Sequence, residues 1–285
     1  MEIGKKSKLH NLTGTGIWNT YFEPAMSSGV DVMTECPKLP IVTLSSLMVY
    51  PGLHTCAPWS VQGWAHPWIP KYLRPEYRNE TMEEWIDQRH HAASVVVRDY
   101  FRPLPWLQED YQRANPNKDG ACLAMHIRLT DKADGRSKLS LSDFEPYARY
   151  YAEHSPSAHK IFVATDDETV LDTIKVEWSS FLSDNGNIRL LYRNDTLRGS
   201  NNQSMAVFDQ YNQQRHRTNT EALSDIYAMS RCHHLVHGYS AMSDASIAIN
   251  YEYLRHQAFN LDLHLGDEML QRFQRNVMGQ VWYVE

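Results

Sequence analysis

The stretch Ala121-Cys-Leu-Ala-Met-His-Ile-Arg-Leu-Thr-Asp-Lys132 decides how the chain is expected to fold. Residues 121–127 are apolar apart from His126, which is typical of a strand buried on both faces of a parallel sheet. Polar residues follow at once, beginning with Arg128. Ligands of open parallel sheets bind beyond the carboxyl ends of the strands. We therefore expect a strand that delivers a binding site at its end.

Strands and helices are predicted to alternate after this stretch. Further strands are expected over residues 160–164, 188–192 and 235–238, and helices over residues 142–151, 167–178, 219–231 and 244–254. Alternation of this kind indicates an α/β fold in which helices cover both faces of a parallel sheet.

The residues before this stretch are rich in Pro, Trp and Tyr and show less periodicity. Apolar spacing predicts a helix from Thr81 to the Arg102–Pro103 step, and a short helix from Leu104. The turn-rich segment 115–120 follows these helices. We place the domain boundary there, between an amino-terminal lobe (residues 1–115) and a carboxyl-terminal lobe (residues 116–285).

Composition narrows the class of protein. The 285 residues carry a net charge of -6, with a pI near 6.2, which argues against a general nucleic-acid-binding protein. The mean hydropathy is -0.54, and no apolar run approaches the roughly 20 residues that cross a bilayer. No apolar segment of a signal peptide follows Lys5, Lys6 and Lys8. We therefore expect a cytoplasmic protein or a soluble catalytic fragment.

The four cysteines are scattered and show neither a CxxC pair nor the spacing of zinc ligands. Cys122 and Cys232 lie in apolar stretches and are expected to be small core residues. Whether Cys36 and Cys56 pair is left open. The pattern favours a reducing, cytosol-like compartment.

Polar residues follow three of the predicted strands. Arg128, Asp131 and Lys132 follow the first strand, Asp166 and Asp167 follow the second, and Ser240 and Ser243 open the helix after the strand at 235–238. Arginine binds diphosphate oxygens with two N–H groups, and amides at a helix start receive further negative charge. The rim of the sheet formed by the carboxyl ends of these strands is therefore suited to a nucleotide diphosphate. The alternative is structural: Arg128 as a surface ion-pair partner, and one aspartate and the two serines as helix caps.

The chain also resembles a known family at five places. His126-Ile-Arg-Leu-Thr-Asp-Lys132 resembles the His-x-Arg-x-Thr-Asp-Lys signature of the α-1,6-fucosyltransferases. Four other segments are similar to motifs of that family in the same order: Arg102–Leu107, Phe162–Asp167, Leu223–Ser230 and Val236–Ser243. The resemblance covers residues 100–254 and implies a GT-B-like fold of two Rossmann-like lobes, with a reduced amino-terminal lobe and a nucleotide-binding sheet in the carboxyl-terminal lobe.

The resemblance also implies an activity: inverting transfer of L-fucose from GDP-fucose to a hydroxyl of a glycan acceptor, without a metal ion or another cofactor. Arg128 would hold the donor β-phosphate, His126 would line the donor site, and Tyr147 would lie near the guanine. The remaining donor-site residues implied are Asp166, Asp167 and Asp225, facing the nucleoside, and Ser240 and Ser243, facing phosphate. Asp131 and Lys132 would support the loop beside the acceptor hydroxyl.

Two departures from the family pattern matter for chemistry. Leu129 stands where the family has a second arginine, and Arg136, Arg198 and Arg217 are candidates to replace it. The loop at residues 133–138 lacks the family's glutamate, so Asp134 is the first candidate for the general base that inversion requires and Asp131 the second. Two alternatives follow: the same fold with another nucleotide sugar such as UDP-xylose, or a non-catalytic module that binds a nucleotide or glycan.

Overall fold

The structure is a computed structural model. It describes Phe22 and residues 81–116, 121–129, 139–155, 160–184, 188–194, 196, 198, 215–238, 240–262 and 267–279.

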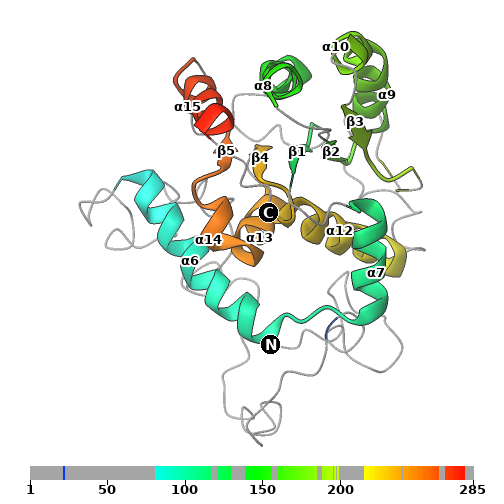
Figure 1. The fold of residues 1–285 in the computed structure, drawn as a ribbon. Helices are drawn as coiled ribbons and strands as arrows, with labels where there is room; N and C mark the ends of the chain where they lie inside the picture. Colours follow the sequence, from blue (N-terminus) through cyan, green and yellow to red (C-terminus); the bar gives the residue numbers. More distant parts are fainter. Residues whose placement is uncertain are drawn as a thin grey trace, which may run out of the picture.

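A five-stranded parallel sheet organises the described residues (Figure 1). Its strands are β1 (Cys122–Ile127), β2 (Lys160–Thr165), β3 (Arg189–Leu191), β4 (His234–His237) and β5 (Ala258–Asn260), in the order β3-β2-β1-β4-β5. The chain reverses its direction of winding between β1 and β4, which is where doubly wound sheets open a ligand crevice. The predicted α/β fold with a Rossmann-like carboxyl-terminal sheet is confirmed.

Nine helices are present in the described part of the chain. They are α6 (Met82–Tyr100), α7 (Pro105–Ala114), α8 (Leu141–His154), α9 (Glu168–Glu177), α10 (Ser179–Asp184), α12 (Arg215–Ser230), α13 (Ala241–Ile249), α14 (Tyr251–Leu254) and α15 (Asp267–Gly279). The helix predicted over residues 244–254 is two helices, divided at Asn250. Strand β5 and helix α15 were not predicted.

Side-chain alternation along β1 divides the core into two layers. Leu123, Met125 and Ile127 pack in one cluster with residues of α8, α9 and α15. Cys122 and Ala124 point to the opposite face and pack with residues of α12 and α13. Because successive strand residues face opposite sides, one buried strand supports both layers. The two helical layers lie above and below the sheet in Figure 1.

Helices α6 and α7, which precede the predicted lobe boundary, pack in the second of these layers. Tyr251 of α14 donates its hydroxyl to Asp87 of α6 (3.0 Å), and Tyr111 of α7 stacks on Tyr227 of α12 (5.2 Å between ring centroids). The boundary at residue 115 stays a prediction, because Phe22 is the only residue before Thr81 that the structure describes.

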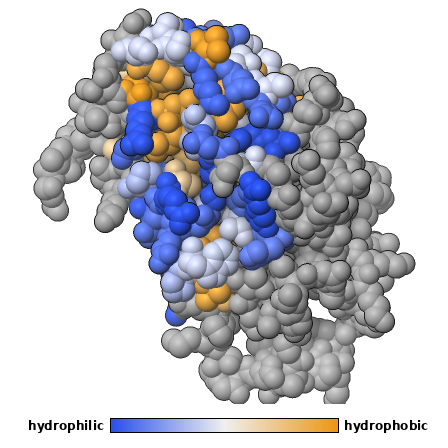
Figure 2. All heavy atoms as spheres, turned by 90° about the vertical axis from the view of Figure 1, so that its right-hand side faces the viewer, coloured by the Kyte–Doolittle hydropathy of each residue, from blue (hydrophilic) through white to orange (hydrophobic). Residues whose placement is uncertain are grey.

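Surface polarity varies over the side that carries α7, α9 and α10. Hydrophobic residues gather at its upper part and hydrophilic residues dominate below (Figure 2). Val176 of α9 is an apolar residue that is 74% exposed. Among the described helices, none combines the length and the apolar character that crossing a membrane requires.

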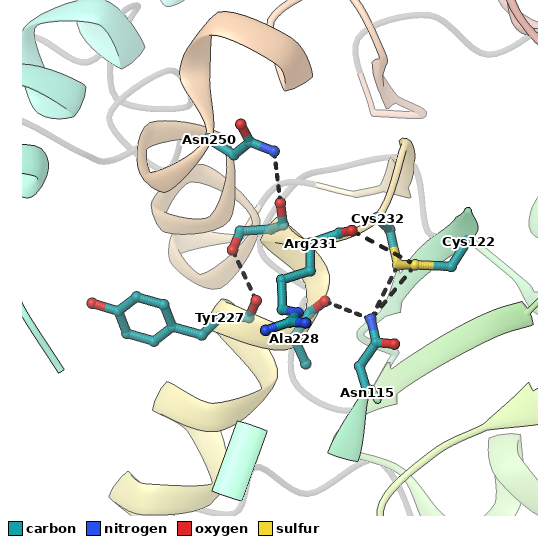
Figure 3. Close-up of a disulfide and its surroundings, with 8 residues drawn as sticks. Asn115, Cys122, Tyr227, Ala228, Arg231, Cys232 and Asn250 are labelled. Carbon is teal, nitrogen blue, oxygen red and sulfur yellow. Dashed lines mark hydrogen bonds between the residues drawn. A yellow bond between two sulfur atoms is a disulfide. The ribbon is translucent and has the colours of Figure 1, made fainter. Parts of the chain in front are cut away.

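Cys122 and Cys232 form a disulfide, which corrects the expectation of two separate core thiols (Figure 3). The bond joins the start of β1 to the turn between α12 and β4, across 110 residues of sequence. Asn115 donates Nδ2 to the carbonyl of Ala228 beside it (2.9 Å). Disulfides persist in oxidising compartments, so the bond argues against the reducing compartment favoured by the sequence. Cys36 and Cys56 lie outside the described residues.

Removing this disulfide should destabilise the fold, because the bond restricts the unfolded chain over a long loop. We expect Cys122→Ala/Cys232→Ala to lower the free energy of unfolding by about 2–5 kcal/mol, measured by urea denaturation. A reducing agent should lower the stability of the wild type and leave that of the double variant unchanged. Equal stability of the oxidised wild type and the double variant would contradict the assignment.

Candidate nucleotide-binding site

The ends of β1 and β2 bring opposite charges together at the rim of the sheet. Arg128 Nε lies 3.4 Å from Asp166 Oδ2, and their side chains are 35% and 25% exposed. The register pairs Ile127 with Thr165, so the residues that follow each strand are neighbours. An ion pair that retains this much contact with water contributes about 0–1 kcal/mol. The Arg128–Asp166 contact itself therefore opposes the binding of a ligand anion at Arg128 only weakly.

The amino-terminal end of α13 lies against the end of β1. His126 Nδ1 is 2.7 Å from Ser243 Oγ, and both residues are buried. Ser240 caps the helix by accepting from the amide of Met242 (3.3 Å). The structure thus brings His126, Ser240 and Ser243 together, as the sequence predicts, at a helix start whose amides suit an anion. Ser240 also performs the capping role that the structural alternative assigned to it.

Asp167 serves as the amino-terminal cap of α9. Its Oδ1 accepts from the backbone amide of Thr169 (2.9 Å) and from the Thr169 hydroxyl (2.7 Å). The side chain is buried, whereas that of Asp166 stays partly exposed at the rim. The expectation that one of these two aspartates caps the following helix is therefore confirmed. Asp166 has the better access to a ligand.

Asp225 of α12 lies in a buried network of charges. Its Oδ1 is 3.7 Å from Arg193 Nε, and Arg193 also donates Nη1 to Asp110 Oδ2 (3.1 Å). Burial raises the pKa of Asp225 to about 7, and the positive charges of Arg193 and Arg198 oppose that rise. Asp110 and Arg193 were not anticipated, because they come from α7 and from the end of β3, far apart in the sequence.

Tyr147 lies in the core between α8 and α15. Its ring packs against Phe273 at 5.2 Å between centroids, and 4% of the residue is exposed. Burial, and secondarily the charge of Asp143, raises the pKa of the Tyr147 hydroxyl to about 12. The described contacts do not join it to Arg128 or His126, so its place near the guanine stays a prediction.

The structure places only part of the predicted acceptor side. Asp131, Lys132, Asp134 and Arg136 lie outside the described residues. Leu129 packs against the core cluster on the α8 face. Two of the arginines that are candidates to replace the family's second arginine are described. Arg217 pairs with Glu221 (2.8 Å), and burial lowers the pKa of Arg198.

A contact that the sequence did not suggest links α6 to the same end of α13. His90 Nε2 lies 2.9 Å from Asp244 Oδ1, and both side chains are buried. Asp244 follows Ser243 directly, so two consecutive residues of α13 hold histidines from two different elements. In the part of the chain that the structure describes, no group of three or more His, Cys, Asp or Glu residues is placed to hold a metal ion.

No protein-family model matches this chain. Among solved structures it is similar to an arginine-to-lysine mutant of Arabidopsis thaliana FUT1 in complex with GDP, with 12% identity over 72% of this chain and 43% of that chain and a TM-score of 0.42. It is also similar to NodZ α-1,6-fucosyltransferase soaked with GDP-fucose (18% identity, 60% and 50% coverage, TM-score 0.38) and to the fucosyltransferase NodZ from Bradyrhizobium (15%, 60% and 49%, 0.39).

These three neighbours are fucosyltransferases, the class that the sequence motifs resemble. The chain spans 43–50% of their length.

The buried carboxyl of Asp225 should make stability depend on pH. Its pKa rises from an ordinary 3.8 to about 7 on folding, so the folded state favours the protonated form. Its contribution to stability is therefore greatest below pH 3.8 and is lost as the pH rises toward 7. We expect the wild type to lose stability relative to Asp225→Asn between about pH 5 and 7, by at most about 1.4 kcal/mol per unit.

Chemical denaturation across that pH range measures this difference. Asp172→Asn is the matched control, because Asp172 is exposed on α9 with its side chain 67% accessible. A stability difference between wild type and Asp225→Asn that stays constant with pH would contradict the raised pKa.

Proposed function

We propose that this chain is a glycosyltransferase that binds a nucleotide-sugar donor at the carboxyl ends of β1, β2 and β4. The observation that supports this most directly concerns the carboxyl end of β1. Arg128 follows the strand there, and His126, two residues before it, contacts Ser243 in the first turn of α13, next to the crevice between β1 and β4. The guanidinium supplies paired N–H donors and the helix start supplies backbone amides. Together these groups suit the two phosphates of a nucleoside diphosphate.

We propose GDP-fucose as the donor and a glycan hydroxyl as the acceptor. Support comes from the five motifs in family order and from the carboxylates near the rim, since a carboxylate can accept from N1 and the exocyclic amine of guanine. Asp166 is partly exposed and so has access to a ligand, whereas Asp225 is buried. Another nucleotide sugar, such as UDP-xylose, is the second candidate because Leu129 replaces the family's second arginine.

The remaining residues have defined parts in this proposal. Ser240 and Ser243 would act at the phosphates through the first turn of α13, and His126 would hold Ser243 in place. Asp167 would support the loop after β2 as the cap of α9. Inversion takes place in one displacement, in which a base removes the acceptor proton while the nucleotide leaves. A metal ion is not part of the proposal, since cationic and amide groups would carry the diphosphate charge.

Donor binding can be tested by calorimetry with GDP, GDP-fucose, UDP and UDP-xylose. We expect the guanine nucleotides to bind and Arg128→Ala to weaken their binding by at least about tenfold. The reason is that a hydrogen bond from a charged group such as a guanidinium contributes about 1.5–3 kcal/mol. Arg98→Ala is the matched control, since Arg98 lies on α6 and its side chain is 71% exposed.

Each outcome decides between the possible donors and between an enzyme and a non-catalytic module. Selective binding of the UDP ligands would replace GDP-fucose as the donor. Binding of GDP without turnover or donor hydrolysis would favour a non-catalytic module. Absence of binding by all four nucleotides would overturn the proposal.

Asp134 is proposed as the general base, with Asp131 and Lys132 supporting the adjoining loop. We expect Asp134→Asn to lower the rate of fucose transfer by at least about 100-fold while leaving the Kd of GDP unchanged, because a general base acts only in the chemical step. Asp131→Asn is the comparison. Full turnover by Asp134→Asn would exclude Asp134 as the base.

A further inference from the structure

A pocket of about 280 Å³ lies beside the edge strand β5, and neither Arg128 nor Asp166 lines it. Residues of α6, α13, α15 and the turn after α14 line it, together with the last residues of β4 and β5. Figure 1 shows α6, α14 and α15 around β5 at this end of the sheet. None of the lining residues belongs to the donor site described above.

We propose that this pocket binds a sugar ring, either a free monosaccharide or one residue of a glycan. The first reason is its charge. Two arginines of the lining, Arg255 and Arg272, are matched by two carboxylates, Glu84 and Asp87, so these four charges cancel. A phosphate or carboxylate would gain little from such a lining. A neutral ligand with many hydroxyl groups fits it better, because each hydroxyl both donates and accepts.

The second reason is the supply of hydrogen-bond donors. The Arg272 guanidinium lies 5.8 Å from the centre of the Phe259 ring, and no carboxylate of the described residues forms an ion pair with it. Asn260 uses its Oδ1 to accept from the amide of Asp262 (3.0 Å), which leaves its NH₂ group for another partner. Two donors of different geometry therefore lie in one small volume.

The third reason is the supply of acceptors. Asp87 Oδ2 accepts from the Tyr251 hydroxyl (3.0 Å) and lies 3.5 Å from Arg255 Nη2, so its orientation is fixed and Oδ1 remains for a ligand. Glu84 likewise uses only Oε2 for Thr81. The His90–Asp244 contact holds the wall formed by α6 against α13. The site is thus preorganised, which lowers the entropic cost of binding.

Apolar side chains complete the lining. Ile86, Ile247 and Met269 border the pocket between the polar groups. A sugar ring presents C–H groups between its hydroxyls, so this mixture matches both parts of its surface. Polar groups fix the orientation of a ligand and apolar ones supply contact area, as in most small-molecule sites.

The pocket is also close to the rim. The register aligns His126 of β1 with His237 of β4 and His237 with Asn260 of β5. Two strand spacings separate His126 from Asn260, or about 10 Å. A glycan held in the pocket could therefore extend toward the donor. Only this link between the pocket and the donor rests on the proposed function.

Ligand-observed NMR with methyl glycosides of N-acetylglucosamine, mannose and galactose tests the pocket, and chitotetraose tests a glycan chain. We expect one of these saccharides to bind, and both Arg272→Ala and Asp87→Asn to weaken it by about tenfold or more. Arg275→Ala, an exposed arginine on the same helix and outside the lining, should bind as the wild type does. Thermal unfolding of each variant shows whether it is folded.

The saccharide that binds identifies the source: a methyl glycoside alone indicates a free sugar, and tighter binding of chitotetraose indicates a glycan. Added GDP should not displace the saccharide, whether or not GDP itself binds. Three results would overturn the inference: no binding by any saccharide, binding unaffected in both folded variants, or displacement by GDP. Failure of GDP to bind would count against the donor proposal and not against this pocket.

Discussion

The parallel pairing of β1 with β4 is the constraint on which the rest of the structure depends. It places the end of β1 beside the loop that leads into α13, and so allows His126 to meet Ser243 at 2.7 Å. The same pairing brings Cys122 to Cys232 at the opposite end of β1. Register between buried strands is strongly specified, because a shift by one residue would turn every side chain to the wrong face. Both ends of β1 are thereby fixed by one set of backbone hydrogen bonds.

Features that depend on short-range pattern could be predicted from the sequence. The apolar run ending at Ile127 and the capping residue Asp167 carry their signals within a few residues. Strand β5 could not be predicted because three residues are too few to show a period. The division between α13 and α14 at Asn250 could not be predicted because the apolar spacing continues across it. The charged surroundings of Asp225 could not be predicted, since Arg193, which pairs with both Asp225 and Asp110, approaches these two residues only after the sheet forms.

The buried polar residues around α13 show how the fold balances specificity against stability. His90, His126, Ser243 and Asp244 are all buried, and each has a hydrogen-bond partner in another element. Buried polar groups cost free energy unless they are paired, so such contacts tolerate little displacement. Helix α13 is therefore held at a defined position relative to β1 and α6. A binding site built on its first turn gains that precision.

The disulfide makes a covalent ring of the segment from Cys122 to Cys232, which contains β1, β2, β3 and the described helices α8, α9, α10 and α12. A protease that cuts one peptide bond within this ring produces two fragments that remain joined through the sulfur atoms. The nicked molecule would run at full mass on a non-reducing gel and separate only after reduction. It would also keep β1 tethered beside β4, so that a single cut in a surface loop need not unfold the protein.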